Sequence, residues 1–73
     1  SKEYKIILTT ARRESLRTRT ESELARLGIP YDVLVMGISK GHRVVINDRR
    51  PNGDETAFSV NINRDSGLGE VEL

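Results

Sequence analysis

Two apolar runs, each followed at once by polar residues, stand out in the hydrophobic pattern of this chain. Residues 6–8 are Ile-Ile-Leu and residues 44–46 are Val-Val-Ile. Continuous runs rich in β-branched residues are typical of strands that are buried on both faces of an α/β sheet. The pattern therefore predicts one strand over 4–10 and another over 43–47, with hydroxyl groups after the first and a carboxylate after the second.

A helix is predicted between these strands, over residues 12–27. Gly28 can adopt the left-handed conformation that ends many helices, and Pro30 prevents the helix from continuing. Either Thr10 or Thr9 can serve as its N-cap. The inward-facing positions of this helix share a helical spacing and are Leu16, Thr20, Leu24 and Leu27.

The rest of the pattern predicts two more strands around a loop and a turn. Residues 32–36 indicate a short buried strand, and the loop 37–42 is too short to hold a helix. Asn-Gly at 52–53 is a strong turn signal. Beyond it, apolar and polar residues alternate over 56–62, as in a strand with one solvated face. The predicted fold class is α/β: a partial Rossmann-like sheet, mostly parallel, with one main helix and an antiparallel edge strand at 56–62, in a single partial domain over 1–73.

Composition narrows the class of protein. The chain has 73 residues and a net charge of +1, so its core is thin and it lacks the basic stripe of a nucleic-acid-binding protein. It has no cysteine, which excludes disulfides and thiolate metal sites. No apolar run approaches the roughly 18 residues of a membrane span. We expect a cytoplasmic protein without nucleic-acid or membrane partners.

Six segments of the chain, in their order and at their spacing, resemble parts of a known protein family. They are residues 8–14, 20–24, 27–32, 34–37, 40–41 and 44–51. Together they resemble the later part of a haloacid dehalogenase superfamily phosphatase domain, of the small, cap-poor type found beside carbohydrate and capsule biosynthesis. The resemblance covers most of residues 4–68. The opening Asp-x-Asp strand of the family, which carries the nucleophile and the general acid, has no counterpart here.

The resemblance implies Mg²⁺-dependent hydrolysis of a phosphorylated small molecule, with sugar phosphates among the candidate substrates. Thr10, with Thr9 as the alternative, matches the hydroxyl that binds the transferring phosphoryl group. Lys40 matches the lysine that neutralises its charge, and Arg12 is a candidate phosphate contact. Each residue also has an ordinary interpretation: Thr10 as a helix cap, and Lys40 and Arg12 as solvated surface cations.

The same resemblance places a metal-binding acid at Asp48, with Asn47 beside it. Many relatives have two adjacent acids at this position, and an amide oxygen adds no charge, so we expect weak or undetectable Mg²⁺ binding by this chain alone. Asp48 can equally well open the turn after a strand. Because α/β sites lie beyond the carboxyl ends of strands, we expect Thr10, Lys40 and Asp48 to converge at one edge of the sheet.

The missing strand has consequences for activity and partners. Without the nucleophile, we predict that the chain alone has no phosphatase activity. In the family, the missing strand lies between those matching 4–10 and 43–47, so we expect complementation by an upstream segment, self-association, or a rearranged sheet in which 4–10 and 43–47 pair directly. The rival functional class is a non-catalytic interaction module that retains the fold.

Overall fold

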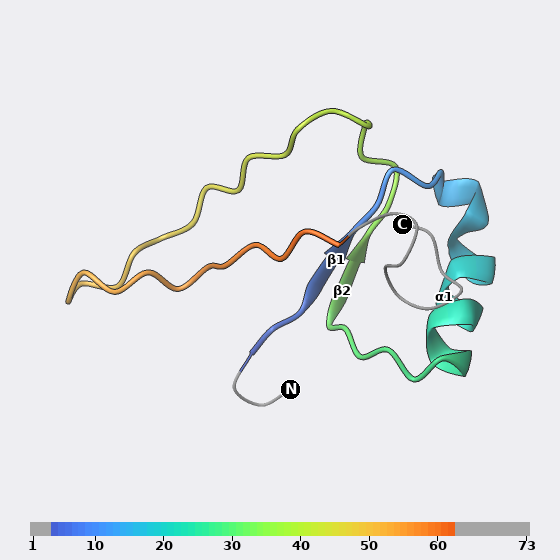
Figure 1. Cartoon of the computed structure of the whole chain (residues 1–73), viewed down its shortest axis with the longest axis horizontal. Coiled ribbons are helices and arrows are strands. Elements are labelled where there is room, and N and C mark those ends of the chain that lie inside the picture. The colour runs from blue at the N-terminus through green and yellow to red at the C-terminus, as the bar shows by residue number, and fades with distance from the viewer. Residues whose placement is uncertain (1–3, 63–73) are drawn as a thin grey trace.

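The computed structural model describes residues 4–62, and this part of the chain forms one βαβ unit followed by a long extended segment (Figure 1). The two strands pair in parallel, with Leu8 opposite Leu34. A helix connects them, as a parallel crossover requires. This is the small α/β class that the sequence predicts. In order along the chain, the elements are β1 (Ile7–Thr9), the 3₁₀ turn η1 (Glu14–Leu16), α1 (Arg17–Arg26) and β2 (Val33–Val35).

A narrow stripe of α1 packs on one face of the sheet. Thr20 and Leu24 on this stripe are both fully buried, with 0% of their surface exposed. Leu24 forms the core with Leu34 and Met36, which lie on and just after β2. The stripe matches the predicted helical spacing, and the core is as thin as the length of the chain implies. Four partly buried residues complete this core: Leu8, Leu27, Ile29 and Tyr31.

The helix starts later than predicted. Residues 11–13 are not helical, η1 follows, and α1 begins only at Arg17. The residue before η1 is Arg13, whose backbone is extended and whose side chain makes no capping hydrogen bond. The prediction that Thr10 or Thr9 caps the helix is therefore wrong, because four residues, 10–13, separate the end of β1 from the first helical turn.

The predicted end of the helix is confirmed. Gly28 has a φ of +68°, and its N–H donates to the carbonyl of Ala25 at 3.1 Å. The N–H of Ile29 donates to the carbonyl of Leu24 at 3.0 Å. These two bonds form a Schellman motif, and Ile29 also packs against the core that contains Leu24.

The structure corrects the second half of the predicted sheet. Residues 43–62, which we call the arm, contain no strand, so the strands predicted over 43–47 and 56–62 are not formed in this part of the chain. The predicted turn is present, since the N–H of Arg50 donates to the carbonyl of Asp54 at 3.0 Å. A lone two-stranded hairpin is marginal in water, and within residues 4–62 no third strand lies beside the arm. All of its residues are exposed.

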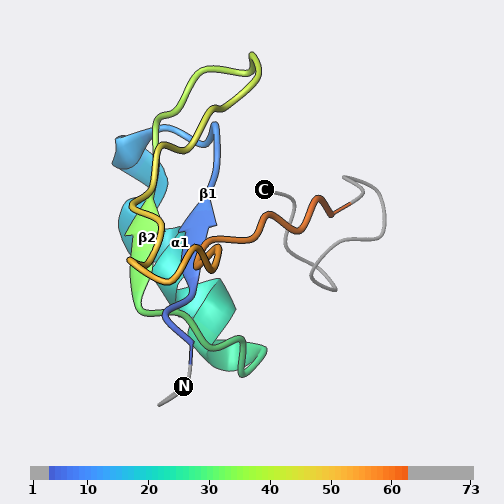
Figure 2. The ribbon, with the colours of Figure 1, turned by 90° about the vertical axis from the view of Figure 1, so that its left-hand side faces the viewer.

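Figures 1 and 2 show that the arm projects from the βαβ unit on the side away from α1, so the sheet lies between the two. The two legs of the arm come together at its turn and separate toward the sheet (Figure 1). No helix among residues 4–62 is long and apolar enough to cross a membrane. The last residues of the family resemblance, 63–68, lie outside the described part of the chain.

Candidate functional site

The carboxyl end of β1 is a tight, buried turn centred on Thr10. Only 1% of the surface of Thr10 is exposed. Its Oγ1 accepts a hydrogen bond from the N–H of Arg12 at 3.1 Å, and its own N–H donates to the carbonyl of Val35 at 3.0 Å. The hydroxyl thus holds the backbone of the turn instead of capping a helix, and its hydrogen can still donate to another group.

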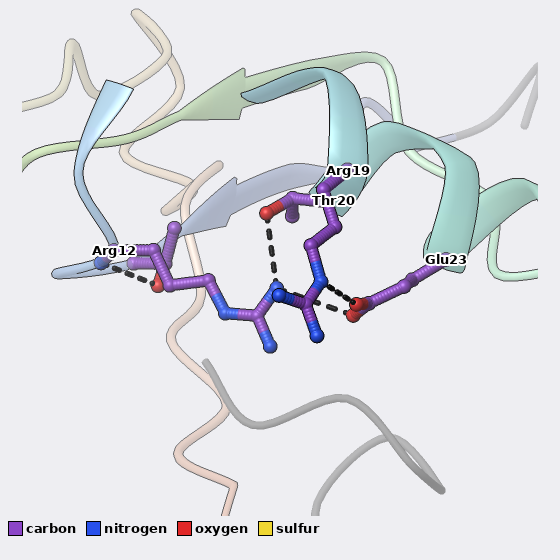
Figure 3. A network of polar contacts seen from close by, with 5 residues as sticks. Arg12, Arg19, Thr20 and Glu23 are labelled. Carbon is purple, nitrogen blue, oxygen red and sulfur yellow. Dashed lines mark hydrogen bonds and ion pairs between the residues drawn. The ribbon is translucent and has the colours of Figure 1, made fainter. Parts of the chain in front are cut away.

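Arg12 links this turn to α1 (Figure 3). Its Nη1 donates to Thr20 Oγ1 at 3.0 Å and to Glu23 Oε2 at 3.2 Å. Arg19 donates from Nε to the other carboxylate oxygen of Glu23 at 3.1 Å. The hydrogen bond from Arg12 is the main cause that lowers the pKa of Glu23 below its ordinary value. The candidate phosphate contact is therefore already paired with a carboxylate and a buried hydroxyl.

The chain that follows β2 returns to the same turn. The N–H of Gly37 donates to the carbonyl of Arg12 at 2.7 Å, and the N–H of Ile38 donates to the carbonyl of Thr10 at 3.1 Å. Gly37 has a φ of +76°, a conformation that L-residues rarely adopt. Lys40 lies three residues after Gly37 and is exposed. The carboxyl edge thus brings together Thr10, Arg12 and the start of the loop that carries Lys40.

Asp48 and Asn47 lie elsewhere. Asn47 Nδ2 donates to Thr56 Oγ1 at 2.8 Å and to the carbonyl of Asp48 at 3.0 Å, and that carbonyl also accepts from Thr56 Oγ1 at 3.0 Å. These contacts join the two legs near the turn. In Figure 1 this end of the arm points away from α1 and from the carboxyl edge of β1. The structure does not bring Asp48 to the expected site.

The donor atoms in the described residues do not match a magnesium site. Within residues 4–62 no group of three or more His, Cys, Asp or Glu side chains could hold a metal ion. Asp48 contributes one carboxylate and Asn47 one amide, which is less than the ligand set that the family resemblance implies. No reaction step through Mg²⁺ can be derived from this arrangement.

A shallow depression lies beside the turn of the arm. Its volume of about 190 Å³ is below the range of typical small-molecule pockets. Arg49 and Glu55 form an ion pair nearby at 3.5 Å. The depression is therefore not a better substrate site than the carboxyl edge. Its lining residues are Tyr4, Arg50, Asp54, Glu55, Thr56 and Phe58.

Two polar links in the βαβ unit escaped sequence reasoning. Arg17 binds Glu14 through two hydrogen bonds of 2.7 and 2.8 Å, and its Nη2 also donates to the carbonyl of Leu34 at 3.0 Å. Asp32 Oδ2 accepts from the N–H of Ile6 at 2.7 Å, which is the main cause of its lowered pKa. The spacing of Glu14 and Arg17 on one helical turn was a usable signal. Nothing in the sequence pointed to the contacts of Asp32 with Ile6 or of Arg17 with Leu34.

Comparison of the chain with protein-family models, with curated proteins and with solved structures finds no match. The geometry described above and the resemblance carried by the residues themselves are therefore the grounds for a functional proposal.

Proposed function

We propose that this chain is part of a haloacid-dehalogenase-like phosphatase domain and is catalytically incomplete by itself. The observation that carries the proposal is the parallel βαβ unit whose carboxyl edge gathers Thr10, Arg12 and the start of the Lys40 loop. Ligands of open α/β sheets bind at this edge. The family resemblance supports a phosphorylated small molecule as the ligand, with sugar phosphates as a candidate class.

In this proposal the three side chains act on the phosphoryl group in different ways. Thr10 donates its hydroxyl hydrogen, since its oxygen already accepts the N–H of Arg12. Lys40 supplies a point charge from an exposed loop. Arg12 can bind an oxyanion in place of Glu23, the carboxylate that it now contacts at 3.2 Å.

The described residues do not supply the covalent chemistry. The residue after β1 is Thr10, and Asp32 precedes β2 at the opposite end of the sheet, where it accepts the N–H of Ile6. A phosphatase of this class attacks phosphorus with an aspartate carboxylate. The chain would therefore bind phosphate without hydrolysing its esters, and Mg²⁺ would belong to the complete domain.

Titration of the full chain with inorganic phosphate, followed by amide chemical shifts, tests the proposal. We expect shifts at Thr10, Arg12 and Gly37, and affinity reduced several-fold in Thr10→Val. Because Thr10 is buried, Lys40→Ala provides a second variant at an exposed position. Thr18→Val, on the exposed surface of α1, is the matched control. Shifts that survive both variants, or hydrolysis of p-nitrophenyl phosphate by the chain with Mg²⁺, would contradict the proposal.

The second candidate function is a non-catalytic interaction module, and the arm favours it. The first leg exposes Ile46 at 96% and the second leg exposes Phe58 at 80%. Exposed apolar residues gathered on one segment mark interaction sites more often than isolated ones do. This candidate predicts that the chain associates through the arm whether or not phosphate is present.

A further inference from the structure

The two outer edges of the sheet differ in their hydrogen bonding. Val33 and Val35 turn main-chain groups toward β1, since the N–H of Val33 donates to the carbonyl of Ile6 and the carbonyl of Val35 accepts from Thr10. Alternation along a strand therefore places the main-chain groups of Leu34 on the outer edge of β2. There Arg17 Nη2 donates to the carbonyl of Leu34 at 3.0 Å. The guanidinium occupies this edge and obstructs the addition of another strand.

Within residues 4–62, no strand pairs with the outer edge of β1. The carbonyl of Ile6 and the N–H of Thr10 face β2, so the main-chain groups of Ile7 and Thr9 face outward. Among the residues that the structure describes, none hydrogen-bonds to these outward groups. The side chain of Ile7 is 60% exposed. An open edge of this kind is a template for pairing with another chain.

The two legs of the arm have the composition of two missing strands. Residues 44–46 are apolar at successive positions, which suits a strand buried on both faces. Residues 57–62 alternate, which suits an edge strand with one solvated face. Counting back from the bonded pair of Arg50 and Asp54, antiparallel register places Ile46 opposite Phe58 and Val44 opposite Val60. The arm can therefore form a hairpin with one continuous apolar face.

We propose that the first leg of the arm of a second copy pairs with the free edge of β1, and that the exchange is reciprocal. The second leg then becomes the new outer strand. Each copy gains a four-stranded sheet, built in the order β2, β1, 43–47 of the partner subunit and 56–62 of the partner subunit. The resulting interface is isologous, as in most homodimers. This inference deepens the interaction-module candidate and does not depend on phosphate binding.

Charge and area are consistent with a second copy as the occupant. Residues 43–50 carry three arginines and one aspartate, a net charge of +2, whereas residues 54–62 carry two acids, a net charge of −2. Each arm is therefore neutral overall, and net charge does not oppose its docking on a second copy. Full burial of a Val or Ile side chain removes about 60–120 Å² of apolar surface, so the exposed apolar side chains on each arm represent roughly 400 Å² and those of a pair roughly 800 Å². At about 60% apolar area, a reciprocal pair would bury about 1,300 Å², the size of a stable interface.

The hinge favours exchange over closure within one chain. Gly37 and Ile38 are fixed to the end of β1 by hydrogen bonds of 2.7 and 3.1 Å. The partner residue steps back from Arg12 to Thr10 as the chain advances from Gly37 to Ile38, so the chain turns over the end of β1 and residues 39–42 remain to cross that strand. Four residues reach about 14 Å, and crossing two strand spacings needs about 10 Å, so closure within one chain leaves little slack. Short hinges of this kind favour domain swapping.

Cysteine cross-linking tests the proposal directly, because the chain has no cysteine of its own. Ile7→Cys on β1 is mixed in turn with Val44→Cys, Val45→Cys or Ile46→Cys on the arm of a second preparation, and the products are oxidised. We expect a mixed disulfide dimer for at least one arm position. Leu16→Cys, exposed on η1, replaces Ile7→Cys as the control and should give no mixed dimer.

Two further measurements make the outcome decisive. Sedimentation equilibrium of the unmodified chain should show a dimer, and Ile46→Thr combined with Val60→Thr should weaken it about tenfold or more, since each change removes apolar surface from the arm. Val33→Thr, on the exposed face of β2, should leave the dimer unchanged. A monomer at all concentrations, a disulfide that forms only within one chain in the Ile7→Cys/Val45→Cys double variant, or arm-to-arm cross-links without any to Ile7→Cys would each overturn the proposal.

Discussion

Replacement of Gly28 by alanine measures how much the positive φ at position 28 costs an L-residue in the folded chain. The φ of Gly28 is +68°, and an added Cβ would meet no atom within 4 Å. The methyl group therefore creates no clash, and only the left-handed conformation opposes it. That conformation costs an L-residue about 1–2 kcal/mol. Alanine also restricts the unfolded chain more than glycine does, which stabilises the folded state by about 0.4–1 kcal/mol. We therefore expect a net destabilisation of about 1 kcal/mol.

Urea and thermal unfolding, followed by far-ultraviolet circular dichroism, measure this cost. A loss of about 1 kcal/mol lowers the melting temperature of a chain of this size by about 4–8 °C. Gly41→Ala is the matched control, since Gly41 is not among the described glycines with positive φ and its added Cβ would lie 3.8 Å from Ser39 Oγ, an ordinary contact. This control should stabilise the chain by up to about 1 kcal/mol.

A chemically synthesised chain with D-alanine at position 28 provides the sharpest check. D-alanine prefers positive φ, so it should stabilise the fold relative to Gly28, opposite in sign to L-alanine. Equal effects of L-alanine at positions 28 and 41, or destabilisation by D-alanine as large as that by L-alanine, would refute the assignment of the cost to the backbone angle.

Three further predictions concern the core and the polar links. Leu24→Ala should destabilise the chain by about 2–5 kcal/mol, whereas Leu24→Met should cost less than about 1.5 kcal/mol, as measured by urea unfolding. Thr20→Val removes the buried acceptor of Arg12 and should cost about 0.5–1.5 kcal/mol; no change in the unfolding midpoint would show that the hydrogen bond from Arg12 to Thr20 adds no stability. The pKa of Asp32 is lowered chiefly by the Ile6 N–H, so its contribution to stability is present above its ordinary pKa and is lost as pH falls through the lower folded value. The urea midpoint should drop below about pH 4, and less steeply in Asp32→Asn; an identical pH profile for that variant would contradict the assignment.

Local chemistry determined which parts of the fold could be predicted. Gly28 and Pro30 mark the end of α1 because backbone constraints act over a few residues, and the structure confirms it. The start of α1 depends instead on how the turn after Thr10 packs, which no short window of sequence encodes. The apolar run at 44–46 indicated a buried strand, yet a strand needs a partner, and a hydrophobic pattern does not reveal whether one is present.

In the candidate site, too, some features could be predicted from local sequence and others depend on the fold. Thr10 was placed correctly at the end of β1 because it lies two residues after the apolar run 6–8. Its approach to the loop before Lys40 follows from parallel pairing, which the strand–helix–strand order predicts. The contact between Arg12 and Glu23 joins residues 11 positions apart across a turn and a helix. Only the three-dimensional path of the chain determines that contact.

Because Arg12 is paired with Glu23, an anion that binds at the carboxyl edge would change the protonation of Glu23, and this change can be measured. Arg12 is the principal cause of the lowered pKa of Glu23. An oxyanion that recruits the guanidinium would withdraw it from the carboxylate, and the pKa of Glu23 would rise toward its ordinary value. In acidic buffer, binding would then be coupled to proton uptake, so the heat of binding would depend on the ionisation enthalpy of the buffer. If the carboxyl edge binds an anion as proposed, Glu23 would make the affinity of that binding rise as the solution becomes acidic.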